Sequence, residues 1–273
     1  MFRGMRSCRR SGSFMTDSVW APQGMGGLLM IKKIIQDSMR SFGYELVPYP
    51  TPDWVRYRNI LRDVLSTLSI TCILDVGANV GQYASSLRAM GYADWIISFE
   101  PVSRNLEQLR TLAADDAKWR VFPWALGKED GFAQINVMES SLFSSFLQPD
   151  PTSAQRFDSA NRVVATERVE VKRLDGVLSE CLKDIESPRI FLKLDTQGFD
   201  LQVLEGAEAV LQRIFALQSE VAFRKIYIGM PDFMQSLAQL LSKGFEVVDF
   251  VPVTREHDRL RVIEMDCIMI RSA

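Results

Sequence analysis

The sequence predicts an α/β fold in which a mostly parallel sheet carries helices on both faces. Short apolar segments typical of buried strands alternate along the chain with segments whose apolar residues recur at helical spacing. A chain of 273 residues is long enough for one large core of this kind. A third observation supports this fold class: residues 73–90 read as a buried strand, a glycine turn and an amphipathic helix, an arrangement that often contacts a ligand.

The predicted elements follow one another in a regular order. Helices are expected at residues 31–41, 53–68, 83–90, 104–113, 200–211 and 231–243. Strands are expected in an apolar run that ends at Asp75 and at residues 95–99, 119–125, 133–137, 163–172, 189–194, 214–223, 245–250 and 262–270. Between the strands at 133–137 and 163–172, the serine-rich segment 139–161 reads as a long loop, and loops of that length are usually functional or disordered.

Composition divides the chain into three parts. Residues 1–30 contain four interspersed arginines and a Pro/Gly-rich stretch, which predicts a disordered basic tail without the apolar region of a signal peptide. Residues 31–67 are expected to form an N-terminal helical cap, two helices joined by a proline-rich bridge. This cap either closes over a ligand cleft or only shields a face of the sheet. Residues 68–273 form the main domain.

Charge and cysteine usage exclude several classes of protein. The 32 basic and 34 acidic residues nearly balance, so there is no electrostatic case for a nucleic-acid partner. The four cysteines are far apart in sequence, which argues against a zinc site and favours a reduced, cytoplasmic setting. No compact cluster of metal ligands is present, and no apolar run approaches the roughly 18 residues that a transmembrane segment needs.

The string D-V-G-A-N-V-G-Q, from Asp75 to Gln82, predicts the kind of ligand that the turn binds. A helix N-terminus suits a carboxylate or a phosphate. A pyrophosphate needs a bare glycine in the middle of the turn, and here that position is Asn79, which argues against NAD. Asp75 would repel a pyrophosphate but attract an ammonium group. An amino-acid headgroup carries both charges, and S-adenosylmethionine is such a ligand.

The end of the second predicted strand supports the same ligand. Glu100 lies roughly 20 residues past the turn, where an acid accepts hydrogen bonds from both ribose hydroxyls. The alternative is that Glu100 only caps the helix that begins near Ser103. The cofactor-binding candidates are therefore Asp75, Gly77, Asn79, Gly81, Gln82 and Glu100.

These motifs, together with later ones, resemble the FkbM family of S-adenosylmethionine-dependent methyltransferases. The first string and F-E-P are followed by L-K-L-D-T-Q-G-F-D-L-Q-V-L-E-G-A at 192–207, Q-S-E-V at 218–221, K-G-F at 243–245 and E-M-D-C-I-M-I-R at 264–271. The pieces occur in order over about three quarters of the chain.

The resemblance implies a fold, an activity and a substrate side. The fold is the Rossmann-like, seven-stranded class I methyltransferase fold, with the last strand antiparallel at or near one edge. The activity is O-methylation of a small-molecule, glycan or lipid-linked acceptor, such as a sugar, a glycolipid or a polyketide-type natural product. The family's corresponding S-S-L segment makes Ser140, Ser141 and Leu142 the substrate-side candidates, and the alternative is a solvated connection.

The candidates for the catalytic base are carboxylates at strand ends. Ligands of an open α/β sheet lie beyond the carboxyl ends of its strands, so Asp195 should share the rim with Asp75 and Glu100. Asp195 is the preferred base, with binding of a substrate hydroxyl as its alternative role, and Glu220 is the second candidate. His257, the only histidine, qualifies only if its segment folds inward.

Three functions from different classes remain open at this point. The first is an S-adenosylmethionine-dependent O-methyltransferase, and the second is an NAD-linked oxidoreductase. The third is a non-catalytic S-adenosylmethionine-binding module, because resemblance of fold alone does not establish turnover.

Overall fold

The computed structural model describes residues 34–44 with gaps at 36 and 40, and residues 53–153, 157, 160–256 and 260–272. The chain divides into two units, residues 1–51 and 52–273. In the first unit, residues 34, 35, 37–39 and 41 are helical, as the periodicity predicts. The predicted basic tail, the proline-rich bridge and His257 lie outside the described residues.

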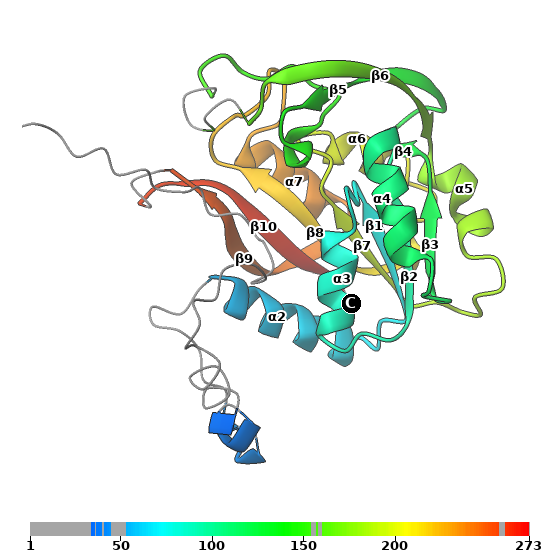
Figure 1. Ribbon diagram of the computed structural model, residues 1–273, viewed down its shortest axis with the longest axis vertical. Coiled ribbons are helices and arrows are strands. Elements are labelled where there is room, and N and C mark those ends of the chain that lie inside the picture. The colour runs from blue at the N-terminus through cyan, green and yellow to red at the C-terminus, as the bar shows by residue number, and fades with distance from the viewer. Residues whose placement is uncertain are drawn as a thin grey trace, which may run out of the picture. The chain divides into compact units, whose positions relative to one another are not determined.

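The second unit is built on a seven-stranded sheet with the strand order β3-β2-β1-β7-β8-β10-β9 (Figure 1). Its strands are β1 (Cys72–Val76), β2 (Trp95–Phe99), β3 (Trp119–Phe122), β7 (Ile190–Leu194), β8 (Ile214–Ala222), β9 (Phe245–Arg255) and β10 (Val262–Arg271). The first five run parallel, whereas β10 runs antiparallel to both β8 and β9. The predicted seven-stranded, mostly parallel sheet with an antiparallel last strand near the edge is confirmed.

Three helices cover each face of this sheet. One face carries α5 (Leu174–Cys181), α6 (Asp200–Glu205) and α7 (Phe233–Ser242), which pack on outward residues of the central strands such as Leu74 and Leu192. The other carries α2 (Asp53–Thr67), α3 (Gln82–Ala89) and α4 (Ser103–Ala113), packed on Ile73 and Phe191. Because both faces are covered, β1 and β7 are buried along their whole length, as central parallel strands usually are.

Helix α2 belongs to the layer that shields the sheet. Its residues Leu61, Val64 and Leu65 are buried in the same cluster as Ile73 of β1. Of the two roles that the sequence leaves open for the predicted cap, shielding of a sheet face describes this helix.

A second, three-stranded sheet lies beyond the carboxyl ends of the central strands, at the top of Figure 1. It contains β4 (Ala125–Leu126), β5 (Gly131–Met138) and β6 (Val163–Lys172) in the order β4-β6-β5. The prediction of one strand from 119 to 125 is wrong in its last part. Pro123 has no N–H to donate, so β3 ends at Phe122 and the chain joins the second sheet at Ala125.

Two other predicted elements differ from the structure. The helix expected at 200–211 ends at Glu205, and turns followed by the short 3-10 helix η2 (Leu211–Arg213) replace its second half. Helix α5 was not predicted, because its eight residues are too few to establish a period. Within the described parts of segment 139–161, the 3-10 helix η1 (Ser141–Phe143) interrupts the predicted loop.

Among the residues that the structure describes, no helix is both long enough and apolar enough to cross a membrane.

We predict that Gly206→Ala destabilises the fold, whereas Gly176→Ala does not. A Cβ atom on Gly206 would lie 1.9 Å from the carbonyl oxygen of Gly127, so the backbone of one segment has to move. In α5, a Cβ atom on Gly176 meets nothing within 4 Å. Thermal or urea denaturation should give a loss of roughly 1–3 kcal/mol for the first variant and a gain of up to about 1 kcal/mol for the second. Equal stabilities would contradict the described packing.

Candidate active site

A cavity of about 620 Å³ opens at the carboxyl ends of β1, β2 and β7, and we refer to it as the main cavity. Four of the six cofactor-binding candidates line it: Gly77, Asn79, Gln82 and Glu100. Ser141, Leu142 and Asp195 from the predicted acceptor side line it as well. The main cavity therefore brings together residues of two groups that the sequence separates by more than forty positions.

The turn between β1 and α3 depends on backbone conformations that few residues adopt. Gly77, Asn79 and Gly81 have φ values of 76°, 50° and 90°, all in the left-handed region. A Cβ atom on Gly77 would lie 2.0 Å from the carbonyl oxygen of Asp195, and one on Gly81 would lie 2.9 Å from Leu109 Cδ1. Gly81 is thus required for packing on α4 and does not line the main cavity.

The amides of this turn are already bonded within the protein. Gly77 and Ala78 both donate their N–H groups to the carbonyl oxygen of Phe99, at 3.1 and 3.0 Å. Asn79 donates its N–H to Glu100 Oε2 at 2.8 Å. A pyrophosphate cradle needs such amides free. These three amides are therefore not available to the pyrophosphate of NAD, which agrees with the substitution of asparagine for the middle glycine.

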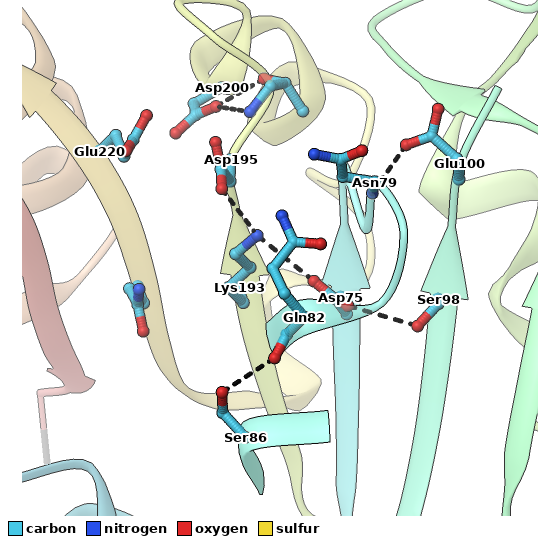
Figure 2. Close-up of polar contacts among 12 residues, drawn as sticks. Asp75, Asn79, Gln82, Ser86, Ser98, Glu100, Lys193, Asp195, Asp200 and Glu220 are labelled. Carbon is cyan, nitrogen blue, oxygen red and sulfur yellow. Dashed lines mark hydrogen bonds and ion pairs between the residues drawn. The ribbon is translucent and has the colours of Figure 1, made fainter. Parts of the chain in front are cut away.

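Glu100 holds the turn against the start of α4. Its Oε2 accepts a hydrogen bond from the N–H group of Asn79 (Figure 2), and its Oε1 accepts one from the N–H group of Val102, each at 2.8 Å. Glu100 is 4% exposed and lies on the cavity wall. Burial raises the pKa of Glu100 to about 7, although the hydrogen bonds from Asn79 and Val102 lower it. Oε1 also accepts a hydrogen bond of 3.5 Å from Asn105 Nδ2, so Oε2 is the oxygen with a lone pair left for a hydroxyl donor, and the ribose role and the capping role are compatible.

The side chain of Asn79 supplies an unused acceptor at the same wall. Its Oδ1 atom is buried and has no hydrogen-bond partner in the described structure. A buried amide oxygen without a partner costs free energy. A ligand with an N–H or O–H donor would remove that cost.

The sequence predicts Asp75 at the ligand-binding rim of the sheet, but the structure places its side chain inside the core. It is fully buried in β1, and it is not among the residues that line the main cavity. Its Oδ2 accepts a hydrogen bond of 3.3 Å from Ser98, and its Oδ1 lies 3.4 Å from the ammonium group of Lys193. Burial raises the pKa of Asp75, and the charge of Lys193 opposes that rise. Direct binding of the cofactor by Asp75 stays a prediction.

Lys193 connects this buried acid to the acceptor side. Its Nζ lies 3.0 Å from Asp195 Oδ2, so the ammonium group bridges β1 and the end of β7 (Figure 2). Burial favours the neutral amine, but the charges of Asp195 and Asp75 outweigh burial and raise the pKa of Lys193. The group therefore carries its positive charge throughout the neutral range.

The two candidate bases lie in different cavities. The side chain of Asp195 is 34% exposed and faces the main cavity. Glu220, near the end of β8, lines a second cavity of about 230 Å³. The side-chain amide of Gln197 joins them, because its Nε2 donates to Asp195 Oδ1 and to Glu220 Oε2, at 2.9 Å each.

The serine-rich segment contributes only part of what was predicted. Ser141 and Leu142 line the main cavity, and Ser140 does not. The backbone of Ser140 is occupied, since its N–H donates to Ala160 O and its carbonyl accepts from Phe143. Ser140 thus fixes the end of η1 next to the cavity.

Two of the wall residues that were not among the predicted candidates are Trp124 and Gln197. Trp124 follows β3 and stacks on Phe122, with ring centroids 4.9 Å apart. Its position just after a strand end was a signal that could have identified it. Gln197 lies next to the predicted Asp195, but its left-handed φ of 54° and its contacts are not visible in sequence.

No group of three or more His, Cys, Asp or Glu side chains in the described part of the chain is arranged to hold a metal ion.

Comparison with known families identifies residues 75–261 as a Methyltransferase FkbM domain, a match over more than half of the chain. The chain belongs to the FkbM methyltransferase family. This match confirms the resemblance carried by the sequence motifs, and with it the predictions of a methyltransferase and of S-adenosylmethionine as its cofactor.

Solved structures similar to this FkbM-family chain share only distant sequence likeness. The methyltransferase domain of bacterial CtHen1-C is 9% identical, with a TM-score of 0.44, over 81% of this chain and 100% of that one. Streptococcus pneumoniae Sp1610, a putative tRNA (m1A22) methyltransferase in complex with S-adenosyl-L-methionine, is 12% identical, with a TM-score of 0.43, over 78% and 72%. Synechocystis PCC 6803 magnesium protoporphyrin IX methyltransferase is 10% identical, with a TM-score of 0.40, over 88% and 97%. No curated protein matches the chain.

We predict that Lys193→Met lowers the free energy of unfolding by about 3–5 kcal/mol, because it leaves Asp75 buried without its cation. The loss should be larger at pH 8 than at pH 5. The charge of Lys193 lowers the pKa of Asp75, which burial raises, so its removal raises that pKa further. The folded variant then binds a proton more readily than the wild type and loses more stability as pH rises above the ordinary aspartate value. Urea denaturation at both pH values measures the difference.

Two further variants test the cause of that loss. Asp75→Asn added to Lys193→Met should recover more than half of the lost stability, since it removes the unpaired charge. Lys172→Met removes a lysine paired with Glu170 on the surface and should leave the free energy of unfolding nearly unchanged, because solvent screens such pairs. If the double variant recovers nothing, the loss comes from packing and the charge pair is not its cause.

Proposed function

We propose that this FkbM methyltransferase transfers the methyl group of S-adenosylmethionine to a hydroxyl of a sugar, a glycolipid or a polyketide-type natural product. The observation that carries the proposal is the main cavity, in which Asn79 and Glu100 line one wall and the accessible carboxylate of Asp195 lines another. One cavity thus contains groups suited to the cofactor and a group suited to an alcohol.

The residues present fit the cofactor. The unpartnered Oδ1 of Asn79 suits a hydrogen-bond donor such as the ammonium group of the methionine part. Glu100 Oε2 has a lone pair left for a ribose hydroxyl. The apolar wall formed by Phe99, Trp124 and Leu126 suits the adenine ring. These assignments leave Asp195 on the side where the methyl group would be presented.

The chemistry requires alignment of three atoms and one proton acceptor. When bound, S-adenosylmethionine supplies a methyl group on a positively charged sulfur. The acceptor oxygen forms the new C–O bond while the C–S bond breaks, and the sulfur keeps the electron pair and becomes neutral. Asp195 takes the hydroxyl proton, and Lys193 and Gln197 hold its two oxygens in place. Accurate positioning of this kind contributes several kcal/mol of barrier reduction.

The acceptor side of the cavity mixes polar and apolar groups. Ser141 offers a hydroxyl, whereas Leu142 is 57% exposed and Phe146 adds an aromatic surface. Such a wall suits a hydroxylated molecule that also carries apolar parts, as glycolipids and polyketides do.

The two alternative functions have less support. The amides of the Gly77 turn are bonded to Phe99 and Glu100, which disfavours the pyrophosphate of NAD. A non-catalytic binding module would not need an accessible carboxylate beside the cofactor wall.

We also propose a cytoplasmic setting, which the free, buried thiols of Cys72, Cys181 and Cys267 support.

Calorimetry with S-adenosylhomocysteine and NAD in parallel tests the cofactor. We expect binding of the first ligand only, and at least tenfold weaker binding by Glu100→Ala. The dissociation constant should also rise roughly tenfold from pH 8 to pH 6, since the pKa of Glu100 is about 7 and hydroxyl donors favour its charged form. Glu100→Gln should flatten this dependence. An unchanged affinity in Glu100→Ala would refute the ribose assignment.

Asp195→Asn tests the base. Turnover should be abolished, because an amide cannot accept the hydroxyl proton, while the affinity for S-adenosylhomocysteine stays within a few-fold. Methyl transfer followed with labelled cofactor and calorimetry give the two measurements. Loss of cofactor binding in this variant would instead place Asp195 in the cofactor site.

A further inference from the structure

The hydroxyl of Tyr227 contacts two parts of the site although Tyr227 lines neither of the two cavities described above. It lies 2.9 Å from Gln197 Oε1, on the amide whose Nε2 donates to Asp195 Oδ1. It also lies 2.8 Å from the carbonyl oxygen of Phe143, the last residue of η1. Tyr227 is fully buried, so its hydroxyl acts on a ligand only through these two neighbours.

The first neighbour belongs to the acceptor wall of the main cavity. Ser141 and Leu142 of η1 line that cavity, and Phe143 ends the helix behind them. Inside the turn, the N–H group of Phe143 donates to Ser140 O at 3.1 Å. A 3-10 helix of three residues has few bonds of its own and depends on its surroundings. The hydroxyl of Tyr227 therefore helps to fix the end of η1.

The second neighbour is the amide that orients the proposed base. Gln197 Nε2 donates to Asp195 Oδ1 at 2.9 Å, while Lys193 lies 3.0 Å from Asp195 Oδ2. A half-turn of this amide would direct its oxygen at the carboxylate, where two acceptors repel each other. With a donor at Tyr227, Gln197 Oε1 stays on the side away from Asp195. Tyr227 thus fixes the orientation of the amide.

One proton serves both contacts. Gln197 Oε1 and Phe143 O are acceptors, so the single hydroxyl proton of Tyr227 is shared between them, as in three-centre hydrogen bonds. Burial raises the pKa of Tyr227 well above its usual range, and the charges of Glu264 and Glu220 raise it further. The proton therefore stays on the hydroxyl at neutral pH. A displacement of either acceptor changes the hydrogen bond to the other.

The backbone on both sides of Tyr227 is also fixed. The sulfur of Met230 accepts hydrogen bonds from the N–H groups of Ile226 and Tyr227, at 3.1 and 3.3 Å. On the next residue, the N–H group of Ile228 donates to Gln148 O at 2.8 Å. These bonds join the loop after β8 to the segment that follows η1. The hydroxyl is therefore held at a defined place between the acceptor wall and the amide.

We infer that Tyr227 is a positioning residue that couples the acceptor wall to the proposed base, because its one hydroxyl fixes η1 and, through Gln197, the carboxylate of Asp195. This inference rests on the proposed function, in which Asp195 takes the hydroxyl proton. Methyl transfer requires the acceptor oxygen, which the wall helps to hold, to meet Asp195 at a productive distance. A common anchor for the wall and the base keeps that distance constant.

Tyr227→Phe tests the inference, because it removes the hydroxyl and keeps the ring. With methyl hexopyranosides as acceptor probes, we expect kcat to fall at least about tenfold, since small displacements of reacting groups slow such reactions strongly. The affinity for S-adenosylhomocysteine should be nearly unchanged, which also shows that the variant folds. Tyr92→Phe is the matched control. It removes a hydroxyl that lies 3.4 Å from Trp95 O at the start of β2, and it should change neither quantity.

A double-mutant cycle separates this coupling from a general loss of packing. In a Gln197→Leu background the connection to Asp195 is already broken, so Tyr227→Phe should lower kcat much less than it does in the wild type. The same fold loss in both backgrounds would make Tyr227 a structural residue and overturn the inference. If Tyr227→Phe does not fold, Gln197→Leu alone decides, and an unchanged kcat in that variant overturns the inference.

Hydrogen exchange of the backbone amides of residues 141–145 tests the contact with η1 without an acceptor. In the complex with S-adenosylhomocysteine, these amides should exchange roughly three- to tenfold faster in Tyr227→Phe, as expected for one lost hydrogen bond. They should not exchange faster in Gln197→Leu, because the shared proton then passes to Phe143. Unchanged exchange in Tyr227→Phe overturns the inference, whether or not the probes are methylated. Turnover retained by Asp195→Asn would instead remove the proposed base, and the exchange comparison would still decide the link between Tyr227 and η1.

Discussion

The arrangement of the site depends on one buried ammonium group. Lys193 lies between Asp75 of β1 and Asp195 at the end of β7, and its side chain is 6% exposed. A buried ion pair adds little net stability, because desolvation offsets most of its attraction, but removal of one partner is expensive. The pair therefore acts mainly as a constraint on geometry. It fixes the strand that leads to the cofactor turn relative to the strand that carries the proposed base.

The backbone around that ion pair is equally constrained. Gly77 approaches the carbonyl oxygen of Asp195 so closely that no side chain fits between them. Glu100 binds the next part of the turn to the start of α4. The turn is thus held from the β7 side and from the β2 side, and its amides are used for this purpose. On this wall the Oδ1 atom of Asn79 and the second lone pair of Glu100 Oε2 remain for a ligand, and both suit hydrogen-bond donors better than phosphate.

Sequence patterns predict the parts of this molecule that follow local rules. The strands β1, β2 and β7 and the rim position of Glu100 and Asp195 follow from apolar runs that end in acids. The segment around Pro123 was predicted less well. The chain passes there from one sheet to the other, and this change depends on strand partners that are distant in sequence. The burial of Asp75 depends on its register opposite Lys193, and the bridge made by Gln197 depends on a left-handed backbone and on Tyr227. Neither the burial of Asp75 nor the bridge made by Gln197 can be recognised from a local sequence pattern.

The chemistry of methyl transfer decides which role is left for the second acid. An enzyme whose leaving group departs as an anion needs a general acid, and a pair of carboxylates with separated pKa values commonly supplies acid and base. Here the sulfur leaves as a neutral group, so no proton has to be delivered to it. In the proposed reaction Asp195, paired with Lys193, accepts the hydroxyl proton. Glu220, whose pKa burial raises well above its usual range, therefore has no leaving group to protonate, and what the structure shows for it is a contact with Gln197, the amide that also holds Asp195.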